Sequence, residues 1–229
     1  MSSVDFYAHL ASQPCRAVQI FMKANNIPFN YHFIDLPKGE QSTEAFLKIN
    51  PFGKVPAIKD GDFCLAEGIA IVQYLAAKYS TPEHWYPKDT ATRARVNEYL
   101  CWHHSNTRGG AGGVFYNVAI IAKVRQQPRN EAAIKEAKEK LTSALNMFEN
   151  YFVKDRSYIG GSEICIGDIF AACEFSQLDH LGIDIGKKRP NVKAWRERVI
   201  AKLGAHYQEA HETIDNFAKH FNFTTEPFE

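Results

Sequence analysis

The chain has no apolar run close to the roughly 20 residues that a membrane-spanning helix needs, and no basic-then-apolar leader at its start. It also lacks an excess of charge of either sign, since 27 Lys and Arg stand against 26 Asp and Glu. The balance gives no reason to expect nucleic acid, a membrane surface or a polyacidic partner. These absences predict a cytoplasmic globular protein that binds neither nucleic acid nor membrane.

Cysteine pairs with functional spacing are also missing. The five cysteines are an odd number and form neither a CxxC pair nor a Cys/His zinc pattern. The neighbouring His103 and His104 have no third ligand at metal spacing, so we expect them to pack and expect no metal site. Reduced thiols are predicted, most of them buried: Cys15, Cys64, Cys101, Cys165 and Cys173.

With 229 residues, the chain is long enough for two domains with cores of their own. Residues 1–80 read as β-α-β-α-β-β-α, with strands near 4–9, 29–34, 54–58 and 63–65. The β-α-β unit predicts parallel pairing, and the turn at 60–62 predicts an antiparallel hairpin. Pro56 can be cis at the start of its strand. The predicted architecture is an α+β domain followed by an all-α bundle.

Residues 81–90 read as a linker in which Trp85 and Tyr86 pack between the two domains. Residues 91–229 read as helical throughout, with helices near 134–152, 166–178, 191–203 and 206–221. The glycine cluster at 109–113 is unexpected in a helix, because each glycine costs about 1 kcal/mol relative to alanine. We expect it to kink or interrupt the helix that begins near Ala91.

The stretch 11–16, Ala-Ser-Gln-Pro-Cys-Arg, lies between the first strand and the first helix. Ser12 is a good N-cap, and Pro14 is tolerated in a first helical turn. A helix N-terminus favours an anion, and a hydroxyl that donates to a thiolate lowers the thiol pKa from about 8.5. The motif therefore predicts either a thiolate site or an ordinary capped helix.

The order of elements and several motifs resemble a cytosolic glutathione transferase of the theta class. The motifs are Ser12-Gln13-Pro14-Cys15-Arg16, Asn50-Pro51 with Lys54-Val55-Pro56-Ala57, Asp60-Gly61-Asp62-Phe63, and Trp85-Tyr86-Pro87 through Glu98-Tyr99-Leu100. They cover the first hundred residues closely and the helical part more loosely. The resemblance implies a thioredoxin-like glutathione-binding domain at 1–80, and a helical electrophile-binding domain at 91–229.

The activity that the resemblance implies is conjugation of glutathione, as co-substrate, to small hydrophobic electrophiles by a homodimer. Ser12 would be catalytic, donating to the glutathione sulfur. Tyr7 is the alternative activator, although its position in the first strand favours a packing role. Cys15 completes a CxxC-like spacing whose first cysteine is Ser12, so dithiol exchange is not expected. Rival functions are a non-catalytic binding protein, or a glutathione-dependent thiol transferase or peroxidase.

The resemblance also implies the residues that hold glutathione. Val55, before Pro56, would offer backbone groups to the cysteinyl part, although a plain structural turn is the alternative. Glu67 would pair the γ-glutamyl ammonium while the Gly68 amide binds the carboxylate. Polar and cationic side chains would complete the site or be merely exposed: Gln13, Gln41, Lys54 and Arg108.

Three features depart from the family pattern. Gly68 replaces a serine or threonine, so it keeps the N–H but lacks a hydroxyl donor for glutathione. The sequence 165–168 is expected to keep only Asp168 of a capping box, because Cys165 replaces its usual Ser or Thr. The glycine cluster falls where a long helix should form a wall of the electrophile pocket, and no extra helix is evident near Glu229 to cover the site.

Overall fold

A four-stranded sheet forms the first part of the computed structural model, which describes residues 3–229. Its strands are β1 (Val4–Ala8), β2 (Phe29–Phe33), β3 (Ala57–Asp60) and β4 (Phe63–Ala66), in the order β2-β1-β3-β4. β1 is parallel to β2 and antiparallel to β3, and β3 is antiparallel to β4. The α+β fold and its strand pairing are therefore as predicted.

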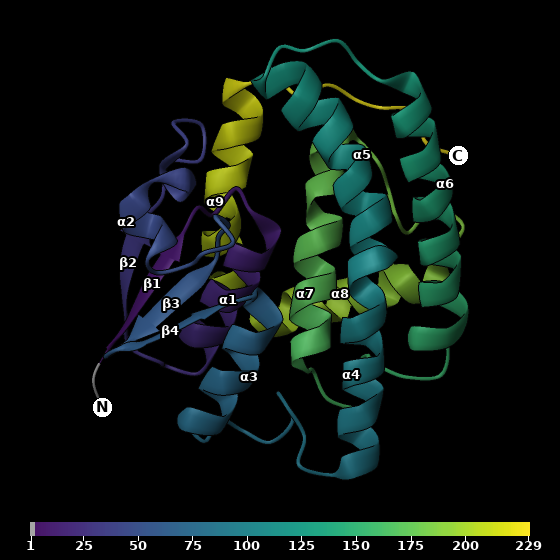
Figure 1. The fold of residues 1–229 in the computed structure, drawn as a ribbon. Helices are drawn as coiled ribbons and strands as arrows, with labels where there is room; N and C mark the ends of the chain where they lie inside the picture. Colours follow the sequence, from purple (N-terminus) through teal and green to yellow (C-terminus); the bar gives the residue numbers. More distant parts are fainter. Residues whose placement is uncertain (1–2) are drawn as a thin grey trace.

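Helices cover both faces of the sheet, and the side chains of β1 alternate between these two faces. Val4, Phe6 and Ala8 are fully buried beneath α1 (Gln13–Ala24) and α3 (Gly68–Lys78), which lie side by side in Figure 1. Tyr7 points to the other face, where it packs against Phe46 of α2 (Glu44–Leu47). One face thus joins the main core, and the other buries a small cluster of its own.

The rest of the described chain is helical, as expected. Figure 1 shows α4 (Thr90–Ser105), α5 (Gly113–Phe115), α6 (Glu131–Met147), α7 (Ile166–Ser176), α8 (Pro190–Leu203) and α9 (Ala205–His220). Every residue of α7 is buried, and α7 packs against α1 as well as α4 and α8. No helix within residues 3–229 combines the length and apolar character needed to cross a bilayer.

The predicted contact of the linker with both parts is present. The Trp85 ring stands edge-on to Phe21 of α1, and its carbonyl accepts the Ile166 N–H at the start of α7. The Tyr86 hydroxyl lies within 3.2 Å of both Gln73 of α3 and Asn97 of α4. These contacts fix the angle between the sheet and the bundle.

The prediction was that glycines 109–113 would kink or interrupt the helix, and the regular α-helix does end before them. α4 ends at Ser105, and the chain then continues in wider π-helical turns over Arg108–Gly112 and Tyr116–Val124. The glycines also allow close helix packing. A Cβ on Gly110 would lie 2.6 Å from the Leu141 backbone, and one on Gly113 would lie 3.1 Å from Ala137. Helix α6 can approach this closely only where side chains are absent.

Thr43 caps α2 by accepting the Phe46 N–H, and the cap of α7 differs from expectation. At α7, Cys165 forms the capping box that we expected to keep only Asp168. Asp168 accepts hydrogen bonds from both the Cys165 N–H and its thiol. The Cys165 sulfur in turn accepts the Asp168 N–H, the role that a hydroxyl oxygen usually has in a capping box.

Candidate functional site

A cavity of about 900 Å³ opens where the end of β1 faces the helical bundle. One side is formed by the turn after β1, through His9, Ala11, Ser12 and Gln13, and by loop residues such as Gln41, Lys54 and Val55. The opposite side is formed by Arg108, Phe115, Tyr116, Ile120, Ile214 and Phe217. A polar wall and a largely apolar wall therefore face each other, the arrangement typical of a small-molecule site.

Six of the nine predicted site residues line this one cavity. They are Ser12, Gln13, Gln41, Lys54, Val55 and Arg108. Among the described residues, Pro56, Glu67 and Gly68 are not part of its lining. Pro56 is buried behind Val55, and the Val55–Pro56 bond is cis.

Ser12 is the N-cap residue of α1, as predicted, but its side chain does not cap. Its backbone is extended, with φ −84° and ψ 128°, and no N–H of the described helix donates to its hydroxyl. The Ser12 N–H donates instead to the His9 carbonyl at 2.9 Å, which closes the turn. The hydroxyl therefore lies on the cavity wall, in hydrogen-bond contact with the Cys15 thiol but not bound to a helix N–H.

Arg16 holds this turn in place from beneath, a role that the sequence analysis missed. Its buried guanidinium donates to the carbonyls of Leu10 and Ala11 at 2.9 and 3.0 Å, and to that of Cys173 in α7 at 3.1 Å. Burial lowers the pKa of Arg16. The three carbonyl oxygens accept hydrogen bonds from the guanidinium and so stabilise it in its buried position. The turn is thus tied to the centre of the bundle.

Glu174 is a second buried group behind the cavity wall that the sequence did not reveal. Its Oε1 accepts from the side-chain amides of Gln13 at 3.1 Å and Gln177 at 2.9 Å. Its Oε2 lies 3.5 Å from Arg108. Burial raises the pKa of Glu174, whereas the Arg108 charge and these amide donors favour the carboxylate. Gly112 leaves room for it, since a Cβ there would lie 2.8 Å from Oε1.

Asn50 shapes the loop that carries Lys54 and Val55. Its buried side chain donates to the Lys54 carbonyl at 2.6 Å and accepts the Phe52 N–H at 3.0 Å. Gln41 lies beside this loop, and its buried Oε1 has no hydrogen-bond partner within residues 3–229. An amide oxygen left unpaired at a cavity wall is available to a ligand N–H.

Glu67 and Gly68 lie at the start of α3, next to the first turn of α1. Glu67 has φ 65°, a left-handed conformation that costs energy for a non-glycine residue, and its side chain is exposed. Gly68 is buried and helical, so its φ is not positive. An added Cβ would lie 3.2 Å from Pro14 and 3.3 Å from Phe170. Packing therefore accounts for a glycine here.

Tyr7, His103 and Cys15, which the sequence analysis weighed as activator, metal ligand and redox thiol, all have packing roles in the structure. Tyr7 stacks on His32 at 4.6 Å and, on the described chain, lies outside the cavity lining. His103 is buried, and burial lowers its pKa to about 3. Cys15 is also buried, which raises the pKa of its thiol to about 11 and leaves it unreactive. Residues 3–229 contain no cluster of three metal-ligating side chains.

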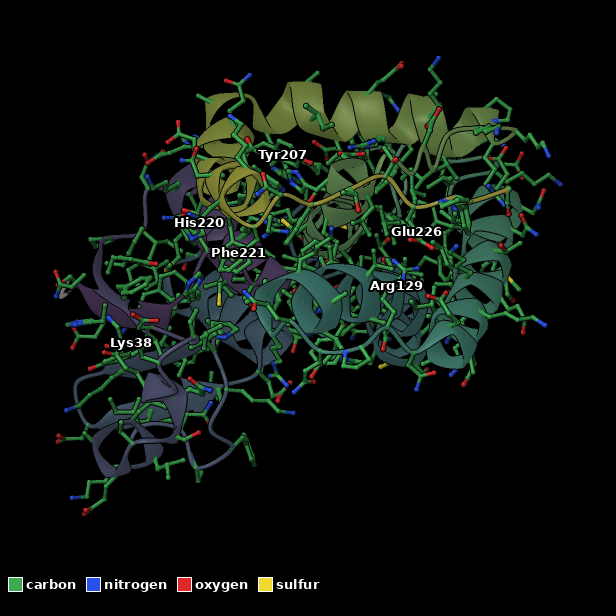
Figure 2. All side chains as sticks on the ribbon, turned by 90° about the horizontal axis from the view of Figure 1, so that it is seen from above. Lys38, Arg129, Tyr207, His220, Phe221 and Glu226 are labelled. Atoms are coloured by element: carbon green, nitrogen blue, oxygen red, sulfur yellow. The ribbon has the colours of Figure 1, made fainter. Side chains whose placement is uncertain are left out.

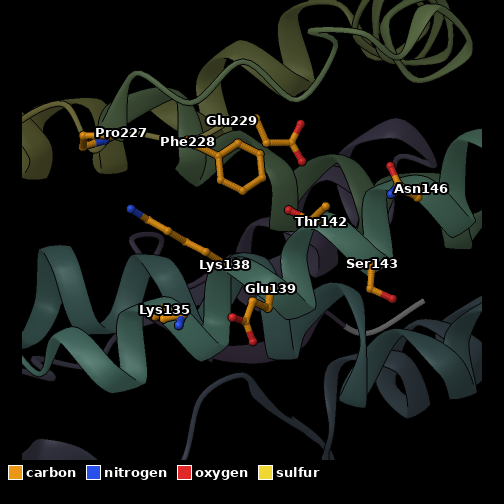
Figure 3. A pocket seen from close by; sticks show the side chains of 9 residues that line it. All are labelled: Lys135, Lys138, Glu139, Thr142, Ser143, Asn146, Pro227, Phe228 and Glu229. Carbon is orange, nitrogen blue, oxygen red and sulfur yellow. The ribbon is translucent and has the colours of Figure 1, made fainter.

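A separate, shallower cavity of about 550 Å³ lies under the C-terminal segment (Figure 3). It is formed by α6 residues, among them Lys135 and Lys138, and by Phe228 and Glu229. The Lys138 ammonium already pairs with Glu226. None of the described residues that line this cavity has an unpaired buried side-chain atom, whereas Gln41 in the cavity at Ser12 has one, so the cavity at Ser12 is the better candidate site.

The chain was compared with known proteins. Residues 2–77 match the family model described as "Glutathione S-transferase, N-terminal domain", and residues 114–202 match "Glutathione S-transferase, C-terminal domain". The chain is 42% identical to mouse glutathione S-transferase theta-3 over 92% of its own length and 88% of that protein's. Human glutathione S-transferase theta-1 is 38% identical over the same shares.

The fold is also similar to solved structures. The human theta-class enzyme in complex with the glutathione conjugate of 1-menaphthyl sulfate has a TM-score of 0.91 and 38% identity, covering 98% of this chain and 94% of that one. The apo form of human T1-1 has a TM-score of 0.90 and 37% identity, covering 97% and 92%. Sequence and fold comparisons therefore agree along almost the whole chain.

Proposed function

The chain belongs to the glutathione S-transferase family, and we propose that Ser12 is the residue with which it activates glutathione. The protein is an enzyme that joins the thiol of glutathione, its co-substrate, to small electrophiles. Its relatives of the theta class indicate the same reaction for this cavity. The cavity has the two walls that such a reaction needs, one polar and one apolar.

The position of the Ser12 hydroxyl on the cavity wall carries this proposal. Since no helix N–H uses the Ser12 oxygen, the hydroxyl can donate to a sulfur bound above it. The N-terminus of α1 adds a favourable potential, and Arg108 across the cavity adds a cation. Together they favour thiolate over thiol, and a bound thiolate is the nucleophile. Tyr7 is less suited, because its ring is stacked on His32 outside the lining.

We place glutathione along the polar wall. The Val55 backbone would pair with the cysteinyl part, with Gln41 and Lys54 near the glycyl end. Glu67 and the Gly68 N–H, at the start of α3, would hold the γ-glutamyl ammonium and carboxylate. On this view Pro56 shapes the loop, and Gln13 braces Ser12 through Glu174.

The two parts of the chain would bind different substrates. Residues 1–80 would bind glutathione, 81–90 would link, and 91–229 would bind a small hydrophobic electrophile on the apolar wall. Membership of the theta class further supports a cytoplasmic homodimer, with the region of α3 and helix α4 in the contact.

Replacing the serine hydroxyl tests the assignment. We expect Ser12→Ala to lower kcat/KM for an alkyl halide about 100-fold and to raise the pKa of bound glutathione toward that of a free thiol. Stability should change by less than about 1 kcal/mol, because no capping bond is lost. Conjugation rates, thiolate absorbance and a thermal melt measure these effects.

Tyr7→Phe is the control, since it keeps the stacked ring and removes only a hydroxyl. It should leave the pKa of bound glutathione unchanged. If instead Tyr7→Phe raises this pKa and Ser12→Ala does not, tyrosine is the activator. Parallel assays with an organic peroxide and a mixed disulfide would reveal a peroxidase or thiol transferase using the same thiolate.

A further inference from the structure

His9 offers the cavity a ring nitrogen, Nε2, that donates to no other described residue. We propose that the Nε2–H of His9 hydrogen-bonds an acceptor oxygen of the electrophile and stabilises the negative charge that develops there. His9 would then be a second catalytic residue, one that selects electrophiles such as α,β-unsaturated carbonyl compounds. This inference rests on the proposed function, because it needs a thiolate held at Ser12.

His9 lies in the same turn as Ser12. The residue is only 6% exposed and lines the cavity. Its carbonyl accepts the Ser12 N–H at 2.9 Å, so the two residues form the ends of one tight turn. The imidazole folds over this turn, because its Nδ1 lies 3.1 Å from the Ala11 N–H.

That contact favours one tautomer of the ring. Since Nδ1 accepts from the Ala11 N–H, the proton of the neutral imidazole is on Nε2. Burial lowers the pKa of His9 and outweighs the charge of Asp35 and a hydrogen bond with its own backbone, so the neutral form prevails near neutral pH. No other described residue accepts a hydrogen bond from Nε2. Because His9 lines the cavity, a ligand bound there can supply an acceptor for this donor.

The neighbours of the ring place it on the electrophile side. Phe33 lies 5.1 Å away at 41°, and Phe217 of α9 lies 6.1 Å away, edge-on at 83°. Phe217 itself lines the cavity beside Ile214 and belongs to the apolar wall. The two aromatic rings restrict the imidazole, so its donor is oriented before substrate binds.

The step with an unsaturated ketone illustrates the role. The glutathione sulfur forms a bond to the β-carbon, and the π electrons of the C=C bond move to give an enolate. The enolate oxygen accepts the His9 Nε2–H bond, and water then protonates the α-carbon. With an alkyl iodide, the sulfur–carbon bond forms as the carbon–iodine bond breaks, and iodide leaves with the electron pair. Iodide is a poor acceptor, so His9 should matter little there.

Two substitutions separate the two nitrogens of the ring. In His9→Asn, the amide oxygen can replace Nδ1 and keep the Ala11 contact, but the Nε2 donor is lost. In His9→Gln, the amide nitrogen can reach the position of Nε2, but the acceptor for Ala11 is lost. The probes are benzalacetone, which has an acceptor oxygen, and hexyl iodide, which does not.

We expect His9→Asn to lower kcat/KM for benzalacetone about 10- to 100-fold and to change that for hexyl iodide less than about threefold, with an unchanged melting temperature. His9→Gln should melt lower but keep more of the benzalacetone activity. Equal losses with both probes, or no loss with either, would overturn the proposal. Thiolate absorbance without electrophile tests Ser12 alone, so a failure of the proposed function is seen separately.

Discussion

Gly68 shows how one residue can serve packing and binding at once. Its missing side chain lets the start of α3 approach Pro14 of α1 and Phe170 of α7. The same residue presents an N–H where we place the γ-glutamyl carboxylate. The sequence drew attention to the absent hydroxyl but could not show the crowding, because both neighbours are far away along the chain.

We therefore expect Gly68→Ser to have two opposing effects. Its Cβ must displace Pro14 or Phe170 by a few tenths of an ångström, which should cost about 1 kcal/mol of stability. Its hydroxyl should add a hydrogen bond to a charged group and tighten glutathione binding about tenfold. Gly68→Ala is the matched control, since it introduces the Cβ alone.

Calorimetric titration with glutathione and urea unfolding separate these effects. Both variants should lose similar stability, and the serine variant should bind glutathione more tightly than the alanine variant. Equal affinities of the two would mean that the γ-glutamyl group is not held at residue 68.

Site residues differ in how well the sequence predicts them. Ser12, Lys54 and Val55 lie in short local motifs, and the structure brings them to one cavity. Arg16 and Glu174 act through contacts that join α1 to α7, with partners more than 150 residues apart. A tertiary contact of this kind leaves no local pattern. His9 lies beside the motif, but its free nitrogen emerges only from the hydrogen bonds of the folded turn.

Among the helices, the packing of α6 against the glycine-rich turn shows where helix propensity misleads. The spacing of apolar residues predicted both the helix from residue 91 and helix α6. Each glycine, however, was expected to destabilise its helix. Gly110 instead permits contact with the backbone of Leu141, and Gly109 faces open space. Two neighbouring glycines with the same intrinsic propensity thus have different roles.

We expect Gly110→Ala to destabilise the protein by about 3 kcal/mol, because its Cβ would lie 2.6 Å from the Leu141 N and Cα atoms, and backbone atoms cannot move aside cheaply. Gly109→Ala should be neutral or stabilising by up to about 1 kcal/mol, as expected for a helical glycine with nothing within 4 Å. Urea unfolding monitored by circular dichroism gives both values. Similar losses in the two variants would show that propensity, not helix contact, dominates here.

On the scale of the whole molecule, the C-terminal segment closes the helical bundle. After α9 the chain passes Phe221 and crosses to Glu226, which lies next to Arg129 in Figure 2. Glu226 also accepts from Lys138 of α6 at 2.7 Å, and its N–H donates to the Leu181 carbonyl at 2.8 Å. The segment therefore joins α9, α6 and the turn after α7. Its sequence has no periodic pattern, so this role could not be predicted.

The stability that this C-terminal segment contributes to the fold should depend on pH. Burial raises the pKa of Glu226, but hydrogen bonds from Arg129 and Lys138 outweigh it and hold the pKa below the usual value. A carboxylate with a lowered pKa stabilises the fold above its unfolded pKa, and this contribution is lost as pH falls through the folded value. We expect Glu226→Gln to cost about 1–2 kcal/mol at neutral pH and almost nothing in strong acid. Glu131→Gln, which removes the exposed partner of Arg129, should cost less than about 0.5 kcal/mol throughout. Thermal melts of both variants and the wild type across the acid range measure the difference. A cost for Glu226→Gln that persists unchanged in acid would mean that the segment is held by shape and its backbone bond, with no contribution from the charge.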